Sequence, residues 1–203
     1  MKRDFFLFSF SFVIFLSFAN ITLSQVKIDI TRGRVEPMPI AVAEFVISGG
    51  SVENIGRRIS SVISNDLERS GLFRPINKNS FVQQLYSFDT VPRFPDWRVI
   101  NAQALIQGEV SEIRNGRVRV SYRLWDVFTG QELKGQEFVT PKANWRRVSH
   151  IIADNIYEEI TGETGYFDTR IVYVSESGPL NARIKRLAIM DQDEENHRFL
   201  TDG

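Results

Sequence analysis

The feature that most constrains the fold is an amphipathic helical stretch between two short apolar runs. Apolar side chains recur every three or four positions along residues 51–70, the spacing of one helix face: Val52, Ile55, Ile59, Val62, Ile63 and Leu67. Ser51 is a suitable N-cap, and Gly71 can end the helix. The continuous apolar runs at 40–47 and 72–76 are typical of buried strands. The order strand, helix, strand predicts a βαβ unit whose helix covers one face of a sheet.

A meander of three antiparallel strands is predicted next. Residues 104–113 form a strand-like run, and the Asn-Gly pair at 115–116 is the strongest short hairpin signal. Residues 117–124 then alternate polar and apolar, so one face should meet the core and the other water; the apolar members are Val118, Val120, Tyr122 and Leu124. A Thr-Gly pair at 129–130 turns the chain into a third strand over 132–140.

A second amphipathic helix closes this domain. Its apolar stripe runs through 145–161, with Asn144 as candidate cap and Gly162 as its end: Val148, Ile151, Ile152, Ile156 and Ile160. Residues 77–101 are less regular and predict only a helical turn, near 80–85, and a loop that leads into a short helix. We therefore predict an α/β domain over 40–164, with a mixed sheet and helices mainly on one side.

Residues 165–203 differ in character from what precedes them. Two strands are predicted, over 167–176 and 183–190, with an acidic turn at 191–196. Two or three strands do not make a stable domain by themselves. We therefore expect this segment to be the truncated beginning of a larger β region. A short C-terminal sheet extension is the alternative.

The first residues have the pattern of a secretory signal peptide. A positively charged start is followed by an apolar run over 5–18. Thr22 and Ser24 stand three and one positions before a plausible cleavage site at Gln25. The apolar run is shorter than the roughly 20 residues that a membrane span needs. We expect a cleaved signal peptide over 1–24 and an exported protein, with a retained signal anchor as the alternative.

Residues 25–39 predict an extended N-terminal arm. Val26, Ile28 and Ile30 alternate with polar residues, which is the period of a strand. Two prolines near the end of this segment interrupt the pattern, because proline lacks the N–H that a strand ladder needs. An edge strand in the resting protein is the alternative interpretation.

Charge and cysteine content argue against several classes of function. Lys plus Arg and Asp plus Glu each number 25, so the formal net charge is zero. Nucleic-acid-binding surfaces normally carry a basic excess, so no nucleic-acid partner is expected. The sequence has no cysteine, which excludes disulfides, thiol nucleophiles and Cys-ligated zinc.

The residues with catalytic potential form no recognisable set. His150 and His197 stand at no useful spacing from a nucleophile or a ligand set, so we expect structural or surface roles. Three acidic residues alternate near the end of the chain: Asp191, Asp193 and Glu195. They resemble the start of a calcium loop, but Asn196 occupies the place of the required Gly, which favours a solvated hairpin turn. The Arg pairs at 57–58 and 146–147 are expected on exposed helix faces. We predict no catalytic residue, no metal site and no cofactor.

Four sequence segments together carry a resemblance to a known family. Residues 40–76 follow a pattern of a P-I-A-V strand, a helix and an S-G-L-F strand, and 102–126 contain an A-x-x-L-x-x-G hairpin. The junction reads DNIYEEITGETGYFDTRIVYV, and the stretch that continues it contains RIKRLAIMDQDEENHRFLTDG. These segments resemble TolB proteins over 26–203, with the last one similar to the first blade of their β-propeller. One departure is Glu194, where the family usually has Gly after the second Asp of a D-x-D-G turn.

The resemblance implies a non-enzymatic adaptor without cofactors in the periplasm. TolB proteins have an α/β domain and a six-bladed propeller, and they belong to the Tol–Pal system, which constricts the outer membrane at cell division and maintains envelope integrity. Their N-terminal arm binds the C-terminal domain of TolA, and their propeller binds the lipoprotein Pal. By this resemblance the TolA-binding arm comprises Gln25, Val26, Lys27, Ile28, Asp29, Ile30, Thr31, Arg32, Gly33, Arg34 and Val35.

Two other functions compete with the adaptor at this stage. A periplasmic hydrolase, such as a peptidase whose catalytic domain follows a propeller, would carry a G-x-S-x-G nucleophile elbow, and this sequence contains none. A sugar- or envelope-binding module without Tol partners is the other. A dispensable arm would favour that module.

Overall fold

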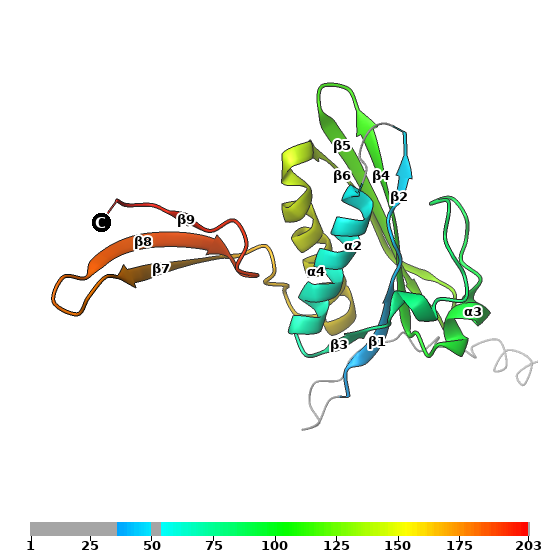
Figure 1. Ribbon diagram of the computed structural model, residues 1–203. Coiled ribbons are helices and arrows are strands. Elements are labelled where there is room, and N and C mark those ends of the chain that lie inside the picture. Colours follow the sequence, from blue (N-terminus) through cyan, green and yellow to red (C-terminus); the bar gives the residue numbers. More distant parts are fainter. Residues whose placement is uncertain (1–35, 50–53, 203) are drawn as a thin grey trace, which may run out of the picture.

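A computed structural model describes residues 36–49 and 54–202. The predicted signal peptide 1–24, the arm residues 25–35 and the predicted cap Ser51 lie outside the described residues. The described chain forms two sheets (Figure 1). The larger sheet contains β1 (Met38–Val42), β2 (Val46–Ser48), β3 (Phe73–Pro75), β4 (Ala104–Ile113), β5 (Arg117–Asp126) and β6 (Glu132–Pro141). The smaller sheet contains β7 (Arg170–Ser177), β8 (Ile184–Asp191) and β9 (Arg198–Phe199).

The larger sheet is mixed, in the order β3-β1-β4-β5-β6, with β2 also paired to β4. β1 is parallel to β3 and to β4, whereas β4, β5 and β6 are antiparallel neighbours. The predicted βαβ unit and the predicted meander are both confirmed. Asn115 and Gly116 have φ values of 66°, the left-handed conformation that a tight hairpin turn requires.

The run predicted as one strand over 40–47 is two strands separated by a bulge. Val42 pairs with Ile106, but Val46 pairs with Glu109, so the first strand carries one extra residue between these pairs. Phe45 lies in this interval and is 2% exposed. An inserted residue bends a strand and re-aims its side chains, and here the bulge accompanies a phenylalanine turned into the core.

The first strand also begins earlier than predicted. The Met38 N–H donates to the Leu72 carbonyl at 2.8 Å, and the Pro39 carbonyl accepts from the Gln103 N–H at 2.9 Å. Both residues therefore belong to the sheet. The predicted arm 25–39 is too long at its C-terminal end, because the missing N–H of Pro39 does not prevent its carbonyl from joining the ladder.

Two helices cover one face of the larger sheet: α2 (Ile55–Arg69) and α4 (Trp145–Thr161), which lie side by side in Figure 1. Their apolar stripes bury against alternating residues of β5, and Val118, Val120, Tyr122 and Leu124 are all 0% exposed. Gly162 ends α4 as predicted, with φ 79° and its N–H bonded to the Glu158 carbonyl. Asn144 occupies the N-cap position but makes no side-chain capping bond; a short 3₁₀ turn, η2 (Lys142–Asn144), leads into the helix instead.

The opposite face is partly covered by the segment that was least regular in sequence. It contains the 3₁₀ turn η1 (Lys78–Ser80), placed slightly before the predicted turn, and α3 (Phe94–Val99). A second apolar cluster lies under it: Ala41, Ala43, Trp97, Ala102, Leu105, Trp125 and Val127. The side-chain amide of Gln107 donates to the carbonyls of Ser87, Phe88 and Thr90 at 3.0–3.2 Å, which fixes the long loop to the sheet.

The smaller sheet is antiparallel, in the order β7-β8-β9, and extends away from the helices (Figure 1). Its first strand begins three residues later than predicted, because 167–169 form the connection to α4. Within the described residues, no helix combines the length and the apolar character needed to cross a membrane.

We expect Gly56→Ala to destabilise the protein by about 1–3 kcal/mol. A Cβ at Gly56 would lie 2.2 Å from the Phe45 carbonyl oxygen, so the helix and the bulge could not both keep their positions. The better helix propensity of alanine, about 1 kcal/mol, offsets only part of this cost. Urea unfolding of the chain without its predicted signal peptide measures the effect. Ser61→Ala, on the exposed side of α2, is the control and should change stability by less than about 0.5 kcal/mol.

Candidate functional site

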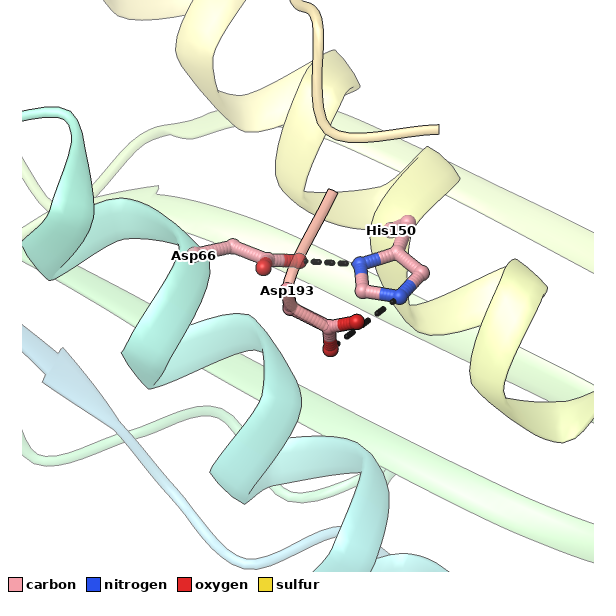
Figure 2. A group of neighbouring side chains, drawn as sticks. All are labelled: Asp66, His150 and Asp193. Atoms are coloured by element: carbon pink, nitrogen blue, oxygen red, sulfur yellow. Dashed lines mark hydrogen bonds and ion pairs between the residues drawn. The ribbon is translucent and has the colours of Figure 1, made fainter. Parts of the chain in front are cut away.

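Three titratable side chains from three different elements meet beside the two main helices (Figure 2). Asp66 comes from α2, His150 from α4, and Asp193 from the turn between β8 and β9. His150 Nδ1 lies 2.6 Å from Asp66 Oδ2, and its Nε2 lies 3.6 Å from Asp193 Oδ2. The Asp66, His150 and Asp193 side chains are only 1%, 3% and 5% exposed. We call these three residues the junction cluster.

The helical periodicity explains why two of these polar groups are buried. Asp66 lies three residues after Ile63 and directly before Leu67, within the buried stripe of α2. His150 lies between Val148 and Ile152, in the buried stripe of α4. A carboxylate inside an apolar stripe is costly unless it is paired. Asp66 was not predicted as a site residue, although its place in the stripe is a signal that could have identified it.

Two arginines and one amide complete the contacts of the carboxylates. Arg146, the fourth residue before His150 on α4, pairs with Asp193 and lies 3.9 Å from Glu195. Arg69 pairs with Asp66 one turn further along α2. The side-chain amide of Gln192 donates to Asp66 Oδ1 at 3.4 Å. The turn between β8 and β9 is therefore attached to both helices.

The local electrostatics favour a charged histidine and a charged carboxylate. Burial lowers the pKa of His150, but the hydrogen bond and charge of Asp66, together with the charge of Asp193, outweigh burial and raise the pKa above its ordinary value. Burial raises the pKa of Asp193, but the hydrogen bond and charge of Arg146, with the charge of His150, outweigh it and hold the pKa below its ordinary value. Asp66 also accepts from the Arg69 guanidinium, so its carboxylate acts as the acceptor in this cluster and the Nδ1–H of a charged His150 donates to it.

The junction cluster contains residue types that can also ligate a metal ion. One potential ligand atom from each of its members lies within 4.8 Å of the other two. However, Arg146 already pairs with Asp193, and Arg69 already pairs with Asp66. A divalent cation between the carboxylates would have to displace one arginine or share the space with it, at a high electrostatic cost. The donor set therefore fits an ion-pair cluster better than a metal centre.

The structure corrects two sequence predictions, one for Asp193 in this turn and one for Arg146 on α4. Asp193 does not lie on a solvated turn, and Arg146, whose side chain is 22% exposed, does not lie on an open helix face, because the two residues pair across the junction. Glu195 is solvated as predicted, at 62% exposed. His197 is elsewhere, with its ring against those of Tyr173 and Phe199.

The turn also explains the local departure from the family pattern. Glu194, which stands where the resembling family usually has Gly, has φ 69°. That left-handed conformation is the one that glycine adopts without strain. The turn therefore keeps the backbone geometry expected of a glycine while carrying a glutamate.

A second attachment fixes the connection between the two sheets. Asp154 on α4 accepts the N–H of Phe167 at 2.6 Å and that of Asp168 at 3.0 Å. Phe167 is 0% exposed and belongs to the main core. Burial raises the pKa of Asp154, and these two backbone hydrogen bonds act in the opposite direction. Gly165 is required here, because a Cβ at this residue would lie 2.4 Å from Asp154 Oδ1.

Comparison with known proteins identifies the family. The family model described as the TolB amino-terminal domain matches residues 26–133, which is more than half of the chain. The chain belongs to the TolB amino-terminal domain family. Membership implies a Tol–Pal-related protein of the periplasm, in a family of non-enzymatic envelope proteins. The resemblance to TolB that the sequence predicted is therefore confirmed.

Solved structures agree with this family. TolB from Acinetobacter baumannii is similar, with a TM-score of 0.67 and 25% identity over 87% of this chain. The match covers 41% of that TolB, so the chain spans less than half of its length. This likeness confirms the predicted fold class, an α/β domain with a mixed sheet followed by the first strands of a β-propeller.

Weaker similarity extends to other proteins. A PelC dodecamer from Paraburkholderia phytofirmans has a TM-score of 0.41 and 17% identity, over 62% of this chain and 88% of that one. The lipoprotein GNA1162 from Neisseria meningitidis has a TM-score of 0.43 and 17% identity, over 52% of this chain and 81% of that one. Similarity at this level carries no functional inference.

We expect Asp154→Ala to destabilise the protein by about 1–3 kcal/mol, because it leaves the N–H groups of Phe167 and Asp168 without their acceptor. The near-ultraviolet circular dichroism should also weaken, since Phe167 packs against Tyr157 and Tyr166. Glu158→Ala, at an exposed position of the same helix, is the control. If both variants unfold at the same urea concentration, Asp154 does not anchor the connection.

Proposed function

We propose that this protein is a periplasmic adaptor that links the inner-membrane protein TolA to the lipoprotein Pal. Its contribution would be to outer-membrane constriction at cell division and to envelope integrity. The observation that carries the proposal is the match to the TolB amino-terminal domain over residues 26–133. The similarity to the TolB of Acinetobacter baumannii, which covers 87% of this chain, supports it.

The start of the larger sheet suits a partner-binding arm. The match to the family begins at Val26, so it includes the segment in which Val26, Ile28 and Ile30 alternate with polar residues. Among the described residues, the first strand of the sheet begins at Met38, whose N–H is bonded to the Leu72 carbonyl. An extended segment directly before a fixed strand can bind a partner by strand addition, because its backbone groups supply hydrogen bonds and alternate side chains fill pockets. We propose residues 25–35 as this arm and TolA as its partner.

The test is a calorimetric titration of the C-terminal domain of TolA into the chain from Gln25 onward. The same titration is made with a chain that begins at Glu36. Removal of 25–35 should weaken binding by at least about 100-fold, or about 2.7 kcal/mol. Undiminished binding would place the contact on the α/β domain. No binding to either chain would contradict the adaptor proposal and reopen the hydrolase and sugar-module alternatives.

A single substitution tests strand addition more directly. Ile28→Pro removes one backbone donor within the arm and leaves residues 36–202 unchanged. We expect TolA binding to weaken by at least about tenfold, while the urea unfolding curve stays the same. Ile28→Val, which keeps the donor and the β-branched side chain, is the matched control and should bind nearly as tightly as the unmodified chain. Equal affinity of the proline and valine variants is the result that excludes strand addition through this residue.

A further inference from the structure

We propose that the junction cluster is a proton-dependent latch, which holds the β8–β9 turn firmly against α2 and α4 when His150 is protonated and loosens this contact when His150 is neutral. The latch concerns the contact between the two sheets. It goes beyond the adaptor function and does not depend on which partner the arm or the propeller binds.

The geometry of His150 supports this assignment. Its Nδ1 is bonded to Asp66, whereas its Nε2 is buried, has no hydrogen-bond partner within the described residues and faces Asp193 Oδ2 at 3.6 Å. In a neutral ring whose Nδ1 carries the proton, Nε2 presents a lone pair toward a carboxylate oxygen. In the charged ring both nitrogens carry protons, so Nε2–H points at Asp193. Protonation therefore replaces a repulsive contact with an attractive one across the junction.

The charges around His150 lead to the same conclusion. Two arginines and three carboxylates face the cluster from the elements that form it: Arg69 and Asp66 on α2, Arg146 on α4, and Asp193 and Glu195 in the turn. Glu195 is 62% exposed, so water screens its charge. The proton on His150 therefore acts chiefly on Asp66 and Asp193, the two buried carboxylates that lie on either side of the ring.

The latch should act over a defined pH range. The pKa of His150 is raised by the folded structure, so its stabilising contribution is complete below the ordinary value of 6.5 and is lost as the pH rises through the raised pKa. The pKa of Asp193 is lowered, so its contribution is present above 3.8 and is lost as the pH falls through the lowered pKa. The turn is therefore held in mildly acidic solution and loosens in alkaline solution.

The contacts show what the latch would control. The β8–β9 turn supplies Gln192, Asp193 and Glu195 to the helices, and the pairs with Arg146, His150 and Asp66 all pass through these residues. The connection bound by Asp154 lies outside this turn and does not involve His150. Neutralising His150 would therefore leave the turn held by Arg146, by the Gln192 side chain and by the bond from the Gln192 N–H to the Thr169 carbonyl, and so loosen the turn while the connection stays attached.

The experiment measures the distance between the two parts as the pH changes. The chain has no cysteine, so nitroxide labels can be placed without background at Ser61→Cys on α2 and Asn181→Cys in the β7–β8 hairpin, both of which are exposed positions. Pulsed electron paramagnetic resonance should give one narrow distance peak at about pH 6, and this peak should broaden or shift at about pH 9. A peak that is unchanged between these conditions overturns the proposal.

Two variants and one control identify the responsible groups. His150→Gln should lose the narrow peak at both pH values, and so should Asp193→Asn, which lies outside the larger sheet and its helices and so leaves their core intact. His197→Gln removes the only other histidine, which is exposed, and should keep the full pH response. A pH response that survives in folded His150→Gln, or that disappears in His197→Gln, would exclude His150 as the switch.

Discussion

A buried carboxylate that must be paired is the constraint on which the junction of the two sheets depends. Asp66 lies on the face of α2 that packs against the core, where an isolated charge would cost several kcal/mol even after local relaxation. Its partners come from the same helix, from α4 and from the β8–β9 turn. The two carboxylate oxygens of Asp66 need hydrogen-bond partners, and this need brings together elements that are far apart in the chain. Apolar packing alone would bring the helices together, but it would not select this turn.

Buried polar side chains are also paired on the other face of the larger sheet. Gln107 is 1% exposed, and its amide group is used in both directions: Nε2 donates to loop carbonyls and Oε1 accepts from Trp125 Nε1 at 3.2 Å. Gln83 likewise accepts from Trp97 Nε1 at 3.1 Å and from the Arg93 N–H. A long loop is normally exposed to water along its length. Here two buried amides and two indoles give it a fixed course.

The sequence predicted correctly those features whose signals lie within a short stretch of the chain. The helices and the meander were predicted correctly because their patterns repeat within about 20 residues, a span that local periodicity covers, and end at turn-forming pairs such as Asn115 and Gly116. The bulge at Phe45 was missed because it arises from a close approach to Gly56 and Gly108, which no periodicity encodes.

The junction cluster was missed for a related reason. His150 is 84 residues from Asp66, and Gln192 is 126 residues from it, so only the folded arrangement makes them neighbours. Isolated His and Asp residues in a sequence give no sign of such a pairing. The family was recognisable from motifs, whereas the predicted arm at 25–35 lies outside the described residues and stays a prediction.

The attachment of Phe167 and Asp168 to Asp154 has a mechanical consequence. Together with the β8–β9 turn, it gives the smaller sheet two points of attachment to the helices α4 and α2. A body held at one point can swing in any direction, but a body held at two can only rotate about the line that joins them. The attachment through Asp154 lies beside the covalent link between α4 and β7, whereas the β8–β9 turn lies farther along the chain and limits rotation about that link.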